Sequence, residues 1–90
     1  MDQGPVTFSE ALAALKMCKK LTREGWNGKG MFIFYNPPMM LPVLAVNNVF
    51  PVGHIVKCRP FIVMKTADDA IVPWLASQTD ILAEDWYTVE

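Results

Sequence analysis

Two tryptophans, Trp74 and Trp86, bracket the stretch that most constrains this chain, I-V-P-W-L-A-S-Q-T-D-I-L-A-E-D-W at residues 71–86. Polar groups lie densely between the two large rings. This arrangement predicts a rim where aromatic surface and hydrogen-bonding groups meet a ligand. The alternative is that both indoles simply fill a small core, because most tryptophans in folded proteins are largely buried.

The same stretch predicts a short helix. Ser77 or Thr79 could begin it, because either hydroxyl can accept a hydrogen bond from a free N–H of the first turn. Ile81, Leu82 and Trp86 follow at helical spacing, and we expect them on the apolar side.

Length and composition limit the classes of protein. Ninety residues predict one domain, residues 1–90, that buries only about 60–65 % of its unfolded surface. A hydrophobic content of 52 % is high for such a chain, so we expect a homo-oligomer in which another subunit covers apolar surface. The net charge of −1 argues against binding a DNA or RNA polymer, which needs a basic excess.

The cysteine and histidine content argues against a metal site and against an oxidising compartment. Cys18 and Cys58 form no CxxC pair, and one histidine, His54, leaves too few ligands for a structural zinc. Residues 1–5 lack the charged and apolar regions of a signal peptide, and no apolar run approaches the roughly 20 residues of a membrane helix. We therefore expect a cytoplasmic protein with both cysteines buried, no membrane contact and no cofactor.

The first helix is predicted over residues 8–19. Thr7 and Glu10 fit a capping box. Apolar residues follow at three-to-four spacing: Phe8, Ala11, Leu12, Leu15 and Cys18. Lysines gather near the end, where cations complement the helix dipole and face solvent: Lys16, Lys19 and Lys20.

Extended segments fill much of the rest. We expect strands at 21–23, 31–35, 55–58, 61–65, 70–72 and 86–89, with 31–35 buried on both faces. Residues 1–6 are expected to be a loose lead-in. Residues 36–53 are hard to assign, and 43–46 could be a helical turn or a strand. The fold class is α+β: an N-terminal helix packed on a mainly antiparallel sheet, with a short C-terminal helix.

Chemical motifs favour binding over catalysis. The chain has no nucleophile elbow, phosphate-binding Walker loop or zinc-protease motif, so we expect no enzyme. Asp68 and Asp69 fit a hairpin turn, and we expect binding not to need them. Trp26 lies on a glycine-rich turn, where a large ring is poorly placed for a core. The candidate binding residues are the rings of Phe8, Trp26, Trp74 and Trp86 with the polar groups of Arg23, Asn27, Ser77, Gln78, Thr79 and Asp80.

Three segments carry a resemblance: T-F-S-E-A-L at 7–12, L-T-R-E-G-W-N-G-K-G-M at 21–31, and M-K-T-A-D-D-A-I-V-P-W-L-A-S-Q-T-D-I-L-A-E-D-W at 64–86. In order and spacing they resemble a family of small phage and prophage proteins, long catalogued as a domain of unknown function, that includes the Thoeris anti-defence proteins of the second type. The resemblance covers nearly the whole chain except residues 36–53.

This resemblance implies a function. Family members are sponges that bind and sequester glycocyclic ADP-ribose, the signal made by TIR-domain enzymes after infection, without cleaving it. It also implies a compact homotetramer with nucleotide at subunit interfaces, acting in the cytoplasm of the infected bacterium. Some members also bind cyclic oligonucleotides of CBASS defence at separate sites. Trp26, Asn27, Phe8 and the 77–80 cluster become pocket candidates. The alternative from another class is a phage protein that inhibits a host protein by direct contact through its apolar surface.

Overall fold

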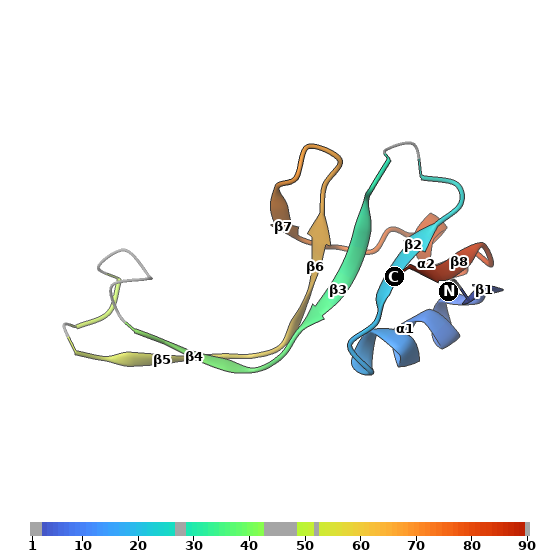
Figure 1. The fold of residues 1–90 in the computed structure, drawn as a ribbon. Coiled ribbons are helices and arrows are strands. Elements are labelled where there is room, and N and C mark those ends of the chain that lie inside the picture. Colours follow the sequence, from blue (N-terminus) through green and yellow to red (C-terminus); the bar gives the residue numbers. More distant parts are fainter. Residues whose placement is uncertain (1–2, 27–28, 43–48, 52, 90) are drawn as a thin grey trace.

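The structure, a computed structural model, describes residues 3–26, 29–42, 49–51 and 53–89. An antiparallel six-stranded sheet has the order β1-β8-β2-β3-β6-β7 (Figure 1). Its strands are β1 Gln3–Val6, β2 Lys20–Arg23, β3 Phe32–Asn36, β6 Phe61–Lys65, β7 Ile71–Pro73 and β8 Trp86–Val89. The other elements are β4 Met39–Pro42, β5 Ile55–Cys58, α1 Phe8–Lys16 and α2 Gln78–Leu82. The predicted α+β class is confirmed.

The capping box predicted for α1 is present. The Thr7 hydroxyl accepts from the Glu10 N–H at 3.3 Å, and a Glu10 carboxylate oxygen accepts from the Thr7 N–H at 3.0 Å. The helix ends at Lys16, so the predicted end at residue 19 was wrong. Cys18 takes φ +65°, its N–H donates to Leu15, and the next N–H donates back to Ala14, which together stop the helix.

Helix α2 is capped by one of the two hydroxyl residues predicted for its start. Ser77, rather than Thr79, is the cap: its hydroxyl accepts from the Asp80 N–H at 3.1 Å, and Asp80 accepts from the Ser77 N–H at 3.2 Å. The predicted apolar side was wrong. Ile81 and Leu82 are 47 % and 76 % exposed, because α2 ends at Leu82 and Trp86 belongs to β8.

The two faces of the sheet differ. Residues paired directly across strands share a face, so Leu21 and its partner Ile33 lie together beneath α1. The buried core gathers there: Ala11, Leu15, Leu21, Ile33 and Trp86 are fully buried. Lys20, Phe32 and Lys65 lie on the opposite face by alternation and pairing. We call that opposite face, which α1 does not cover, the open face.

Strands β4 and β5 form an arm that projects from this body (Figure 1). The arm continues the hairpin of β3 and β6: Asn36 pairs with Phe61, and the same number of residues further along each strand Met39 pairs with Cys58. Within residues 36–53, which the sequence left hard to assign, residues 39–42 thus form a strand, separated from β3 by the prolines at 37 and 38.

Other expectations need correction. Of the expected loose lead-in 1–6, residues 3–6 are instead a strand, because β1 pairs with β8, and residues 1–2 lie outside the described residues. Cys18 is exposed and Cys58 half-buried, so neither is a buried hydrophobe. Strand β3 is not buried on both faces, since only Ile33 is fully buried. The alternatives for residues 43–46 lie outside the described residues. No helix in the described ranges is long and apolar enough to cross a membrane.

Candidate functional site

Four aromatic rings predicted as a binding rim meet at one end of the sheet. Trp86 is fully buried at their centre, and its ring lies 5.5 Å from Phe8, 5.3 Å from Trp26 and 6.0 Å from Trp74 between centroids. Trp26 and Trp74 are half-buried and pack against the core. The view that Trp26 is poorly placed for a core was therefore wrong: the turn after β2 folds its ring inward over Trp86 in an edge-to-face contact.

Asp80 and Asp85 hold Arg23 beside these rings. Arg23 donates from Nη1 to Asp80 and from Nε to Asp85, each at 2.8 Å. The Trp26 indole N–H donates to the same Asp80 oxygen at 3.3 Å, and the Trp86 indole N–H donates to the Asp80 backbone carbonyl at 2.9 Å. Through its carboxylate and its backbone carbonyl, Asp80 thereby ties together strand β2, the turn after it, α2 and β8.

Hydrogen bonds and ion pairs within the cluster favour the charged forms of Arg23, Asp80 and Asp85. Burial acts to raise the pKa of Asp80, but hydrogen bonds from Arg23, Ser77 and Trp26 outweigh it and hold that pKa below its ordinary value. The hydrogen bond from Arg23, followed by one from the Gly25 N–H, lowers the pKa of Asp85 despite partial burial. The Asp85 hydrogen bond in turn raises the pKa of Arg23. The charge of Arg23 is therefore neutralised within the protein by Asp80 and Asp85.

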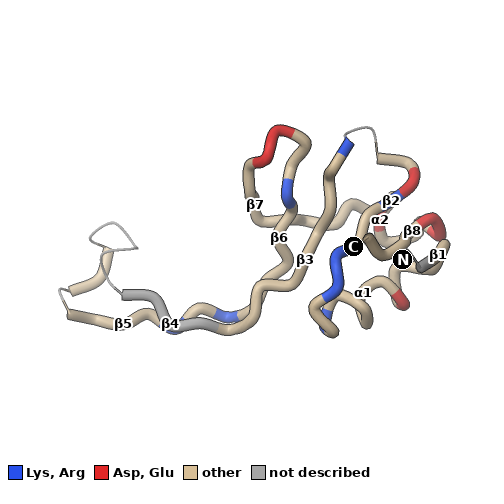
Figure 2. The backbone as a smooth tube through the Cα atoms, in the orientation of Figure 1, with Lys and Arg blue, Asp and Glu red and all other residues tan. Residues whose placement is uncertain are grey.

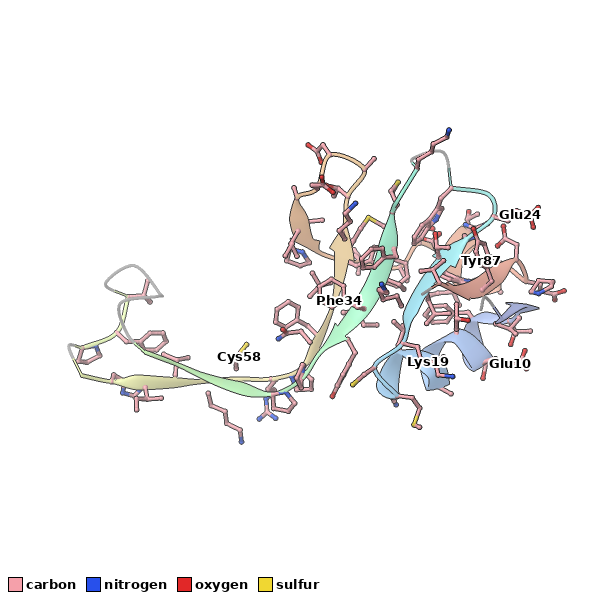
Figure 3. The ribbon with its side chains drawn as sticks, viewed as in Figure 1. Glu10, Lys19, Glu24, Phe34, Cys58 and Tyr87 are labelled. Atoms are coloured by element: carbon pink, nitrogen blue, oxygen red, sulfur yellow. The ribbon has the colours of Figure 1, made fainter. Side chains whose placement is uncertain are left out.

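Next to this cluster the open face is hollowed. The hollow has a volume of about 540 Å³, within the usual range for small-molecule sites. It is lined by Lys20, Thr22, Arg23, Glu24, Trp26, Lys29, Gly30, Met31, Phe32, Lys65, Tyr87 and Val89. We call it the open-face hollow. Tyr87 and Glu24 mark its end of the molecule in Figure 3, far from Cys58 on the arm.

Charge and aromatic surface meet in the open-face hollow. Its lining carries three lysines, Lys20, Lys29 and Lys65, and one acid, Glu24, in a chain whose net charge is −1. Arg23 also lies in the lining, but Asp80 and Asp85 neutralise its charge. The rings of Trp26, Phe32 and Tyr87 supply flat surface. Such a lining suits a compact ligand that is both anionic and planar.

The predicted site residues divide into several groups. Phe8, Trp74 and Asp80 meet in the aromatic cluster, and Arg23 and Trp26 also reach the open-face hollow. The side chain of Ser77 caps α2. Gln78 and Thr79 lie exposed in its first turn, and Asn27 lies outside the described residues.

Sequence reasoning missed part of the hollow: Lys20, Phe32, Lys65 and Tyr87. Lys20 was expected near the C-terminal end of a first helix over residues 8–19, but it begins β2. Alternation puts Lys20 and Thr22 on one face, which is a usable signal. The register that brings Phe32 opposite Lys65 could not be read without the sheet order. In the described part of the chain, no cluster of three histidine, cysteine or acidic residues could hold a metal.

Comparisons with known proteins find matches that cover almost the whole chain. Residues 6–89 match the family described as Tad2-like, the Thoeris anti-defense 2-like domain, which takes in every described strand and helix except the start of β1. The chain is 43 % identical over 84 residues to a protein of Bacillus phage SP01 named Thoeris anti-defense 2. That match covers 90 % of this chain and 91 % of the relative. The chain therefore belongs to the Thoeris anti-defense 2-like family.

Proposed function

We propose that this chain counters Thoeris defence as a sponge: it binds and sequesters glycocyclic ADP-ribose, a cyclic ADP-ribose-type signal, without cleaving it. Family membership supports the anti-defence role. The observation that carries the binding role is the open-face hollow, where three lysines and three aromatic rings line a volume of about 540 Å³.

The chemistry of the hollow fits a cyclic nucleotide. Phosphates need local donors, and Lys20, Lys29 and Lys65 supply ammonium groups on the lining. A base stacked on an aromatic side chain gains about 1–3 kcal/mol. Overall charge is no obstacle, because a few nearby donors decide the affinity for a compact anion.

The proposed setting is the cytoplasm of the infected bacterium, with the protein as a homotetramer. Exposed apolar residues support an assembly, among them Ile71, Val72 and Phe61 around β6 and β7. Cyclic oligonucleotides of CBASS defence are proposed as further ligands on the strength of the family resemblance.

Calorimetric titration with glycocyclic ADP-ribose tests the proposal. We expect saturable binding, and the nucleotide should be recovered intact after the complex is heated and the supernatant chromatographed. Absence of binding would refute sequestration. A chemically altered product would instead indicate a hydrolase. Titration with cyclic dinucleotides and trinucleotides then tests the CBASS ligands.

A second candidate is a direct inhibitor of a host protein, favoured by the same exposed apolar residues of β7. The two mechanisms respond differently to excess signal. A purified Thoeris effector inhibited by sequestration regains activity when nucleotide is added beyond the capacity of the sponge. A directly inhibited effector stays inactive at every nucleotide concentration.

A further inference from the structure

One ring in the open-face hollow lies beneath two ammonium groups. The Nζ atoms of Lys20 and Lys65 lie 5.2 and 5.9 Å from the centroid of the Phe32 ring. Phe32 pairs directly with Lys65 across β3 and β6, and Lys20 reaches the ring diagonally from β2. Three neighbouring strands thus bring two positive charges to one apolar floor.

The two lysines differ in how far their charge is neutralised. Lys65 donates to the Gly30 carbonyl at 3.1 Å and forms an ion pair with Asp69 at 2.7 Å. In the described part of the chain, Lys20 has no carboxylate partner. Among the described residues, the hollow therefore presents one ammonium group without a carboxylate partner and one that an internal carboxylate already occupies.

Asp69 is placed so that it can leave Lys65 at little cost. Its side chain is 83 % exposed, whereas that of Lys65 is 26 % exposed. It belongs to the turn between β6 and β7, which is acidic and lies beside a basic segment of β6 (Figure 2). An exposed ion pair is weak, because water solvates a released carboxylate almost as well as the partner does.

We propose that Lys20 and Lys65 form the diphosphate-binding subsite of the open-face hollow, and that Asp69 is an internal anion that the ligand displaces from Lys65. One phosphate meets Lys20, and the other replaces Asp69 at Lys65, so that Asp69 lowers the affinity of the free protein. This assignment rests on the proposed function for the identity of the nucleotide, but its chemistry is that of any diphosphate.

Opposite changes in affinity test the subsite. In titrations with glycocyclic ADP-ribose, Asp69→Asn should bind about two- to fivefold more tightly, which is the range of an exposed ion pair. Lys20→Met and Lys65→Met should each bind about 10- to 150-fold more weakly, the loss expected for a hydrogen bond to a charged group. Lys16→Met is the matched control, because Lys16 lies on α1, which covers the other face of the sheet; its affinity should not change.

The Asp69→Asn variant separates this role from a purely structural one. It leaves the bond from Lys65 to Gly30 in place, and so does Lys20→Met, whereas Lys65→Met removes that bond. If Asp69 only braces the turn, its replacement lowers the melting temperature and leaves affinity unchanged or weaker, and that result overturns the displacement. Lysine variants that melt like the native protein and bind with native affinity overturn the subsite.

Inorganic pyrophosphate as a second probe distinguishes failure here from failure of the proposed function. If the native protein binds glycocyclic ADP-ribose but the lysine variants bind it equally well, only the subsite is refuted. If the native protein ignores that nucleotide yet binds pyrophosphate in a way that Lys20→Met and Lys65→Met abolish, the subsite holds and the proposed ligand is wrong.

Discussion

Asp80 is the residue on which the end of the sheet depends most. One carboxylate caps α2 through Ser77, pairs with Arg23 and accepts from the Trp26 indole. Its side chain is 13 % exposed, so loss of any one donor would leave a partly buried charge less well satisfied. Asp80 was predicted to contact a ligand, but its bonds to Arg23, Trp26 and Ser77 give it a structural role that explains its presence equally well.

Trp26 combines a structural and a binding position, and two substitutions separate them. Trp26→Ala should lower the free energy of unfolding by about 3 kcal/mol, the lower end for a large core ring, because Trp26 is half-buried. It should also weaken nucleotide binding, because the ring lines the open-face hollow. Trp26→Phe keeps a flat ring but removes the N–H to Asp80, so it should lose less stability and retain most binding.

Thermal melting and calorimetric titration of both variants are the measurements. An unchanged melting temperature in Trp26→Ala would contradict the packing described here. Native affinity in a folded Trp26→Ala protein would remove this residue from the site.

The carboxylates around Arg23 predict how stability depends on pH. Asp80 and Asp85 both have a pKa below the ordinary value of 3.8 in the folded protein. As acid is added, the unfolded chain therefore binds protons before the folded chain does, and stability falls with decreasing pH. We expect the melting temperature to be constant from pH 7 to about 5 and to fall below about pH 4.

The variant Asp85→Asn sharpens this test, since one of the two lowered pKa values is removed. It should be less stable than the native protein at pH 7 but should lose less further stability in acid. Melting curves between pH 7 and pH 3 give both slopes, and equal slopes would mean that the ion pair to Arg23 contributes nothing.

At the scale of elements, the two helix starts were predictable and the helix ends were not. Thr7 and Ser77 each carry a hydroxyl and are followed three residues later by an acidic residue, which is a purely local signal of a helix start. The end of α1 depends on Cys18 adopting a left-handed conformation that favours glycine, and nothing in its side chain signals that. The exposure of Leu82 likewise follows from where α2 sits, which the sequence does not state.

Cys18 therefore offers a stabilising substitution. Cys18→Gly should raise the free energy of unfolding by about 1 kcal/mol, because an L-residue at φ +65° carries a steric cost that glycine does not. Cys18→Ala is the matched control and should bring no gain, since its Cβ remains. Urea unfolding measures both, and an equal stability of the two variants would show that the backbone conformation costs nothing.

The strands were placed well by local pattern, but their pairing was not. Alternation and β-branched residues located β2, β3, β5, β6 and β8 within a residue or two. The sheet order separates β1 from β2 by β8, a long-range arrangement that no local pattern encodes. For this reason the aromatic candidates could be found from the sequence, whereas Lys65 opposite Phe32 could not.

On the scale of the whole molecule, the chain is more extended than a compact chain of its length and carries exposed apolar residues. Its radius of gyration is 15.4 Å, against about 12 Å for a compact chain of this length. A two-stranded ribbon such as the arm is only marginally stable by itself in water. Exposed Ile71, at 65 %, adds apolar surface near the hollow.

We therefore expect a homo-oligomer, most simply the tetramer of the proposed function. Light scattering during size-exclusion chromatography at micromolar concentration measures the mass. A monomeric mass would contradict the assembly and any site that depends on a second subunit, but it would leave the open-face hollow within one chain untouched.

The unbroken register from β3–β6 into β4–β5 has a consequence for how the gene can vary. Because Asn36 opposite Phe61 and Met39 opposite Cys58 keep one offset, a single inserted codon in either arm strand would slip every pair beyond it and turn the side chains to the other face. Matched insertions or deletions on both strands preserve the ladder. Lineages can thus lengthen or trim this arm in paired steps while inheriting the hollow unchanged.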